Sequence, residues 1–205
     1  MNEDSLDRHP PNRSLFAREP LIRRALHACE ISYESRSQSR RLDMTMGDQT
    51  ALREHLIRLL DWRDAHASFE AVVSDWPPQL RGIKPTRCPH TAWQLLEHIR
   101  ICQWDILEFS RDPDHVSPDF PSAYWPATEQ PPDDAAWDRS VHRFLADLQQ
   151  MKRLLADASI DLSVPIPHGQ GQTILREALV VADHNAYHLG QMLLLKRLLG
   201  IYEDS

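Results

Sequence analysis

The sequence of 205 residues is 41% hydrophobic and 26% charged, and its formal net charge is −7. This length and composition allow one medium-sized domain with a substantial core, alone or with a tail, whereas no apolar run approaches the ~18–20 residues needed to span a bilayer. A net acidic chain is also a poor match for nucleic acid, because phosphate binding needs a basic surface.

Cysteine usage and the N-terminal sequence indicate the compartment. Cys29, Cys88 and Cys102 are widely spaced and form no C-x-x-C pair, so the sequence indicates neither a disulfide framework nor a zinc finger. The first residues are polar and lack the apolar stretch of a secretory signal. We therefore expect a cytoplasmic protein that does not insert into a membrane.

Residues 1–43 differ in composition from the rest of the chain. They contain eight Arg, no Lys and seven acidic residues, and their apolar residues do not keep a helical period for long. We expect a flexible N-terminal extension here. The folded domain is predicted over residues 44–205 and opens at Met44 or Met46.

The first long helix is predicted over residues 49–76. Apolar residues recur there close to the 3.6-residue period of an α-helix, and Pro77 and Pro78 end the pattern. His66 lies seven residues after Leu59, which places it on the same predicted inward face. A core-edge imidazole with one hydrogen-bond partner is the favoured interpretation of His66, and a role beside a metal is the alternative.

The second helix is predicted to begin at Thr91, because Thr91 and Gln94 have the spacing of a capping box. Apolar residues cover much of its circumference, and His98 lies among them. An imidazole in such surroundings is expected to be at least partly buried.

A long proline-rich connection over residues 112–132 separates the second and third helices. Its six prolines keep it irregular, and Tyr124 and Trp125 offer aromatic stacking surface. Connections of this length in a compact domain are usually functional or packed across one end of the fold. We therefore treat this segment as a candidate lid.

The third and fourth helices complete the pattern. Asp133 and Asp134 are expected to cap the third, whose apolar residues form one stripe, while Thr173 starts the fourth and Gly200 ends it. Four amphipathic helices without a convincing strand pattern predict an all-α protein built as a helical bundle.

The fourth helix carries the most informative chemical pattern. His184 and His188 are four residues apart, so their rings project from one face about one turn apart, a spacing at which two imidazoles can bind one metal ion. Gln191 continues this face. Such pairs are more often exposed or singly hydrogen-bonded than metal ligands, so a third ligand is needed to decide between the two interpretations.

Two separated motifs supply that third residue. The run Trp93-Gln-Leu-Leu-Glu-His98, followed later by His184-Asn-Ala-Tyr-His188-Leu-Gly-Gln191, resembles the DinB-like superfamily of damage-inducible, metal-dependent proteins. The resemblance covers roughly residues 48–200. It implies an up-down four-helix bundle with a long crossover between helices two and three, a divalent metal held by His98, His184 and His188, and a homodimer.

Three imidazoles are a chemically sensible set of ligands. Neutral imidazoles suit Zn, Ni or Fe(II), and three protein ligands leave a position for water or substrate, as in catalytic sites. A divalent ion held in this way lowers the pKa of a bound water or thiol, so that a nucleophile exists at neutral pH.

Further side chains are candidates for orienting the rings or meeting a bound ligand. Metal-binding imidazoles usually donate their second nitrogen to a neighbouring acceptor, and helix spacing selects five candidates. For Tyr187, packing between helices is favoured over contact with a ligand. The five are Glu177, Gln94, Gln191, Tyr187 and His66.

Several reaction classes are excluded by the local sequence. A zincin protease needs H-E-x-x-H with a glutamate beside the first histidine, whereas Asn185 occupies that position. No G-x-S-x-G, Walker or G-x-G-x-x-G motif is present. Cys102, four residues after His98, is either a soft ligand or a small buried core residue, and the core role is favoured.

These observations predict a metalloenzyme that acts on a small-molecule substrate. Members of the resembled family with known activity include thiol-dependent S-transferases and isomerases that often use low-molecular-weight thiols, so the resemblance implies a transferase-like or hydrolase-like reaction. The alternative is a non-enzymatic, metal-stabilised bundle that acts as a stress-response or binding dimer.

Overall fold

The structure is a computed structural model that describes residues 46–201. The chain divides into two units, 1–46 and 47–205, and the description concerns the second. The extension predicted over residues 1–43 lies outside the described residues. The helices of the described part are α2 (Met46–Leu59), α3 (Phe69–Val73), η2 (Pro78–Leu80), α4 (Ala92–Arg111), η3 (Ser122–Tyr124), α5 (Ala136–Ala156) and α6 (Ile174–Leu198).

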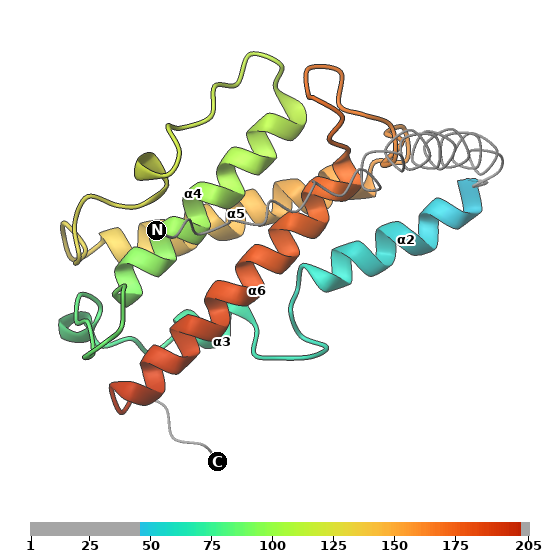
Figure 1. Cartoon of the computed structure of the whole chain (residues 1–205). Coiled ribbons are helices and arrows are strands. Elements are labelled where there is room, and N and C mark those ends of the chain that lie inside the picture. The colour runs from blue at the N-terminus through green and yellow to red at the C-terminus, as the bar shows by residue number, and fades with distance from the viewer. Residues whose placement is uncertain (1–45, 202–205) are drawn as a thin grey trace, which may run out of the picture. The chain divides into compact units, whose positions relative to one another are not determined.

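The all-α class is confirmed for residues 46–201, where helices are joined by loops and the only pairing of extended backbone is an isolated bridge between Pro165 and Thr173. Helix α4 packs against both α5 and α6, and α3 packs against α6 (Figure 1). The up-down order of a four-helix bundle stays a prediction. None of the described helices is long and apolar enough to cross a membrane.

Local sequence explains where the two site-bearing helices begin and end. The Thr91 side chain accepts a hydrogen bond from the Gln94 amide while the Gln94 side chain accepts from the Thr91 amide, so the predicted capping box of α4 is confirmed. Thr173 caps α6 in the same way through the Arg176 amide. Gly200 follows α6 with φ of 69°, a left-handed conformation that suits glycine at a helix end.

The predicted continuous helix over 49–76 is wrong. Helix α2 ends at Leu59, and the chain turns through Trp62, which has φ of 51° and donates its indole N–H to the Ala182 carbonyl at 3.2 Å. Ser68 then caps the short α3. The apolar residues before and after this break are buried in the same core, so their pattern in the sequence continues across it.

His66 lies in this turn rather than on an inward helical face. Its ring is exposed and its Nδ1 is 3.0 Å from the neighbouring Ala67 carbonyl oxygen. The predicted inward orientation of His66 is therefore wrong, since the helix that would have turned the ring inward ends before it.

The start of α5 also differs slightly from the prediction. Ala135 occupies the cap position and makes no side-chain cap, so Asp133 and Asp134 are not the cap residues. Asp133 nevertheless accepts a hydrogen bond from the Ala135 amide at 3.0 Å and pairs with Arg139. Asp133 thus lies two residues before the cap residue, and its negative charge is still close to the first turn of the helix, where it is stabilising.

The connection between α4 and α5 returns alongside α4 (Figure 1). At the N-terminal end of α4, the Thr91 hydroxyl donates to the Glu129 carbonyl at 2.6 Å, and the Trp93 indole donates to the Thr128 hydroxyl at 3.3 Å. The end of the connection is thereby held at the start of α4, and η3 itself packs against α4.

Candidate metal centre

Two packed helices bring three imidazoles together. His98 lies in the second turn of α4, and His184 and His188 lie one turn apart on α6. Their ligand nitrogens all lie within 4.8 Å of one another, and the Nε2 atoms of His98 and His184 are 3.2 Å apart. The three residues that the sequence motifs selected therefore meet at one point between α4 and α6.

Hydrogen bonds made by Nδ1 fix the tautomer of two of the three rings. His98 Nδ1 lies 2.8 Å from the Tyr124 carbonyl oxygen, and His188 Nδ1 lies 2.8 Å from Gln191 Oε1. Both oxygens can only accept, so each Nδ1 carries the proton and donates it. Each Nε2 then keeps its lone pair, as a nitrogen that binds metal must.

Burial keeps all three rings neutral. Burial, followed by the neighbouring His98, lowers the pKa of His184, and burial also lowers the pKa of His98 although the bond to Tyr124 opposes it. For His188, burial lowers the pKa to about 4 despite the bond to Gln191. Neutral imidazoles at pH 7 need not lose protons before they bind a cation.

The geometry and the donor set fit a divalent metal ion. Two nitrogen ligands that each lie ~2.0–2.1 Å from one zinc ion are roughly 2.9–3.4 Å apart, and the His98 and His184 nitrogens are 3.2 Å apart. The positive charge of a metal would also offset the repulsion between the lone pairs of the neutral imidazole nitrogens that face one another here. His98, His184 and His188 could therefore hold the ion together.

A family comparison agrees with this constellation. A family model of the DinB superfamily matches residues 61–192, more than half of the chain, and the match includes all three histidines. The chain belongs to the DinB superfamily. No curated protein and no solved structure matches it.

Aromatic side chains cover one side of the DinB histidine cluster. The Trp125 ring stacks on His98 with centroids 3.8 Å apart and an interplanar angle of 2°, and His90 stacks on Trp125 at 4.0 Å. Trp125 thus lies between two imidazoles and excludes water from one face of His98. The sequence predicts aromatic stacking surface at Tyr124 and Trp125, but only the path of the loop shows that Trp125 stacks on His98.

Of the five side chains predicted to support the rings or meet a ligand, the structure places one against a ring nitrogen. Gln191 accepts from His188 Nδ1, as described above. Gln94 instead completes the capping box, and Glu177, although buried, pairs with Arg176 on its own helix. Tyr187 is 65% exposed, with its ring 4.9 Å from that of His188, so the predicted packing between helices is wrong. His66, exposed in the turn after α2, does not approach the cluster.

Cys102 is a protonated core residue. Its sulfur lies 3.6–3.8 Å from the two ring nitrogens of His98, but burial and then the charge of Asp105 raise its pKa to about 12. A thiol that stays protonated is a poor metal ligand and a poor nucleophile. This supports the core role favoured from the sequence.

Asn185 occupies the position where a zincin protease has its glutamate. Its hydrogen bonds connect neighbouring helices. Its side-chain amide donates to Gln103 Oε1 at 2.9 Å, and the Gln103 amide donates to the Phe144 carbonyl at 2.8 Å. The two residues link α6, α4 and α5 through buried groups. Asn185 is therefore part of the core of this DinB domain, and its side chain also forms a hydrogen bond with the neighbouring His184.

A cavity of about 230 Å³ lies beside the histidine cluster. Gln191 and His90 form part of its wall, so it adjoins both the amide that holds His188 and the ring that stacks on Trp125. Most of the remaining wall is apolar. The lining residues are Arg87, Cys88, Pro89, His90, Leu95, Gln191, Leu194 and Leu195.

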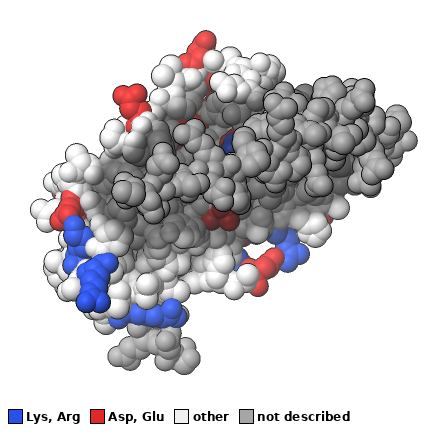
Figure 2. Space-filling model, viewed as in Figure 1, with Lys and Arg blue, Asp and Glu red and all other residues white. Residues whose placement is uncertain are grey.

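Charge on the described surface gives no sign of a phosphate-binding face in the view of Figure 2. Acidic and basic side chains lie there in small separate groups, with the basic ones mainly along the lower edge. The absence of a nucleic-acid partner stays a prediction.

Proposed function

We propose that this DinB protein is a metal-dependent enzyme that acts on a small molecule, with a divalent Zn, Ni or Fe(II) ion held by His98, His184 and His188. The observation that carries the proposal is the set of three neutral imidazoles within 4.8 Å, two of them tied back through Nδ1. Such an arrangement prepares lone pairs for one cation, whereas a core histidine needs only one hydrogen-bond partner.

The bound ion would supply Lewis-acid activation of a water or thiol at neutral pH. The residues of the chain orient the imidazole rings and shield them from water. The Tyr124 carbonyl and the Gln191 amide hold two rings by their Nδ1 atoms, and Trp125 covers one face of His98. Rigid rings and restricted water access are what a preorganised site requires.

The nucleophile is expected to come from outside the chain. Cys102, the thiol in contact with His98, keeps its proton because burial raises its pKa. A water molecule or a free low-molecular-weight thiol remains as the attacking group, which corresponds to a hydrolase-like or an S-transferase-like reaction. A thiol-dependent transfer agrees with what the family resemblance implies.

The apolar cavity beside Gln191 is the proposed site for the carbon portion of the substrate. Its volume of about 230 Å³ holds a small molecule, and Pro89, Leu95 and Leu195 favour an apolar group over a sugar or nucleotide. We further propose a homodimer in the cytoplasm, and light scattering of the purified protein tests the subunit number.

Elemental analysis of protein purified without a histidine tag tests the metal. We expect about one divalent ion per chain in the wild type, loss of most of it in His188→Ala, and retention in His142→Ala, which removes an exposed imidazole on α5. A wild-type protein that contains no metal and takes up none on titration with Zn, Ni or Fe(II) would refute the metal site.

A conjugation screen tests the reaction. The metal-loaded protein is incubated with small electrophiles, each with and without a panel of low-molecular-weight thiols, and products are measured by mass spectrometry. Thiol-dependent product that disappears in His188→Ala supports a transferase, and product without thiol supports a hydrolase. Tight metal binding with no turnover of any substrate would favour the non-enzymatic bundle.

A further inference from the structure

One face of α4 carries a buried stripe under the connection to α5. His98, Cys102 and Asp105 recur at intervals of four and three residues, so they lie along the same side of the helix. Asp105 is two turns beyond His98, about 10 Å along the axis. It does not belong to the histidine cluster, and a carboxylate with 8% exposure requires partners.

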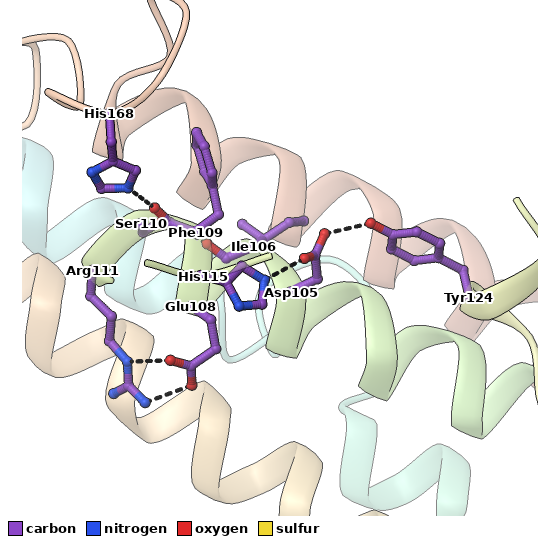
Figure 3. A network of polar contacts seen from close by, with 9 residues as sticks. All are labelled: Asp105, Ile106, Glu108, Phe109, Ser110, Arg111, His115, Tyr124 and His168. Carbon is purple, nitrogen blue, oxygen red and sulfur yellow. Dashed lines mark hydrogen bonds and ion pairs between the residues drawn. The ribbon is translucent and has the colours of Figure 1, made fainter. Parts of the chain in front are cut away.

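Both partners of Asp105 come from the connection. His115 Nε2 lies 2.7 Å from Asp105 Oδ1, and the Tyr124 hydroxyl donates to Oδ2 at 2.6 Å (Figure 3). Burial, followed by the bond to Asp105, raises the pKa of Tyr124 to about 12, so the phenol stays a donor. One carboxylate therefore binds the connection at two points, one soon after α4 ends and one in η3.

Tyr124 joins this carboxylate to the metal centre. Its hydroxyl binds Asp105, its carbonyl accepts the proton of His98 Nδ1, and the next residue, Trp125, stacks on the His98 ring. The place of the Tyr124 backbone beside His98 thus depends on where Asp105 holds the Tyr124 ring.

We propose that Asp105 is a positioning residue for the three-histidine site: by holding Tyr124 and His115 it fixes the carbonyl that sets the tautomer of His98 and so directs His98 Nε2 toward the other two rings. The inference rests on the proposed metal site for its functional meaning. The structural part of the proposal, that His98 carries its proton on Nδ1, applies to the metal-free protein as well.

The alternative is that Asp105 merely fastens a loop to α4. A second loop offers the matched control, because His168 Nε2 lies 2.6 Å from the Phe109 carbonyl oxygen and fastens the segment after α5 to the same helix (Figure 3). That segment carries neither Tyr124 nor Trp125. A general fastening role predicts equal effects at both loops, and a positioning role predicts an effect at Asp105 and Tyr124 alone.

The first experiment reads the His98 tautomer by ¹⁵N NMR of the imidazoles in metal-free wild type, Tyr124→Phe, Asp105→Asn and His168→Gln. The Tyr124 and Asp105 substitutions both keep the shape of the site, because each new side chain is nearly the same size as the old one. Tyr124→Phe removes the hydroxyl that binds Asp105, and Asp105→Asn leaves one acceptor oxygen for two donors. We expect His98 to be protonated at Nδ1 in the wild type and in His168→Gln, and to exchange between tautomers in the other two.

The second experiment measures zinc dissociation into an excess of chelator. Loss of a residue that holds a metal-binding histidine typically costs 10–100-fold in metal affinity. An effect relayed through Tyr124 should lie at or below the lower end of this range, so we expect the rate of zinc dissociation to rise about threefold in Tyr124→Phe and about tenfold in Asp105→Asn. His168→Gln should dissociate at the wild-type rate.

The outcomes of the two experiments are separable. If wild-type protein binds no zinc, the proposed function fails and the tautomer measurement alone decides the inference. If Tyr124→Phe and Asp105→Asn both keep the wild-type tautomer of His98, or if His168→Gln changes it equally, the inference is overturned. Because Tyr124→Phe removes a single hydroxyl, it keeps the test available should Asp105→Asn not fold.

Discussion

Acid should destabilise the metal-free protein through His188 before the carboxylates contribute. The ring is only 8% exposed, and burial lowers its pKa from 6.5 to about 4. Between these values the unfolded chain binds more protons than the folded one, so the free energy of unfolding falls as the pH drops. The contribution of His188 is complete above about pH 6.5 and is lost as the pH approaches 4.

The expected loss follows from the size of the shift. One pKa unit corresponds to about 1.4 kcal/mol, so the full shift of His188 from 6.5 to about 4 corresponds to roughly 3.5 kcal/mol. About 2–3 kcal/mol of this is lost between pH 6.5 and 4, because the ring is half-protonated at each end of the range, in the unfolded and in the folded state respectively. Glu97 acts lower in the range: burial opposes the shift, but the hydrogen bond from Arg100 lowers the pKa of this carboxyl below its usual value of 4.5. Most of the pH range in which His188 is titrated therefore lies above the range in which Glu97 is titrated.

Urea unfolding of chelator-treated protein at several pH values between 7 and 4 measures this effect. With a slope of about 2 kcal/mol per molar urea, the midpoint should fall by about 1 M for the His188 contribution alone. His188→Gln should show a flatter dependence on pH over this window. His142→Gln, which removes an exposed imidazole from α5, is the matched control and should keep the wild-type dependence.

Two results would contradict this reasoning. One is an unfolding free energy that stays constant from pH 6.5 to 4.5 in the metal-free wild type, since a buried neutral ring must resist protonation. The other is a His188→Gln variant with the same pH dependence as the wild type, which would place the responsible group elsewhere.

Two further changes probe side chains that line the cavity beside the histidine cluster. Gln191→Leu removes the oxygen that accepts from His188 Nδ1, so zinc affinity in a chelator competition should fall about tenfold, whereas Gln191→Glu keeps an acceptor and should stay close to wild type; equal affinities for the Leu variant and the wild type would refute the orienting role. Leu194 and Leu198 are similarly exposed on α6, at 53% and 55%, but only Leu194 lines the cavity. Leu194→Trp should therefore raise the KM of any substrate found in the conjugation screen by about tenfold, and an equal rise in Leu198→Trp would count against the cavity as the binding site.

The histidine cluster could be approached from sequence because its determinants are helical. A capping box fixed the start of α4, and the four-residue spacing of His184 and His188 fixed their common face. What the spacing could not supply was His98, because no local rule states which turn of α4 meets α6. The resemblance to a family provided it.

The parts that sequence reasoning missed depend on backbone atoms and on loops. Tyr124 acts on His98 through a carbonyl, a group that every residue has, so the sequence could not indicate this contact. The end of α2 was missed because the apolar residues before and after the break are buried in the same core and their pattern continues across it. Ser68, which caps α3, was the local indication of a break within the predicted helix.

The buried link through Asn185 limits which chemistries this scaffold can acquire by point mutation. A glutamate there would recreate the motif of a peptidase, but it would place a negative charge where the present side chain is 1% exposed and would break the bond to Gln103. An unpaired charge at such a depth costs several kcal/mol, a large fraction of the stability of a typical domain. Descendants of this chain could therefore gain proteolytic activity only after the contacts among three helices had been rebuilt first.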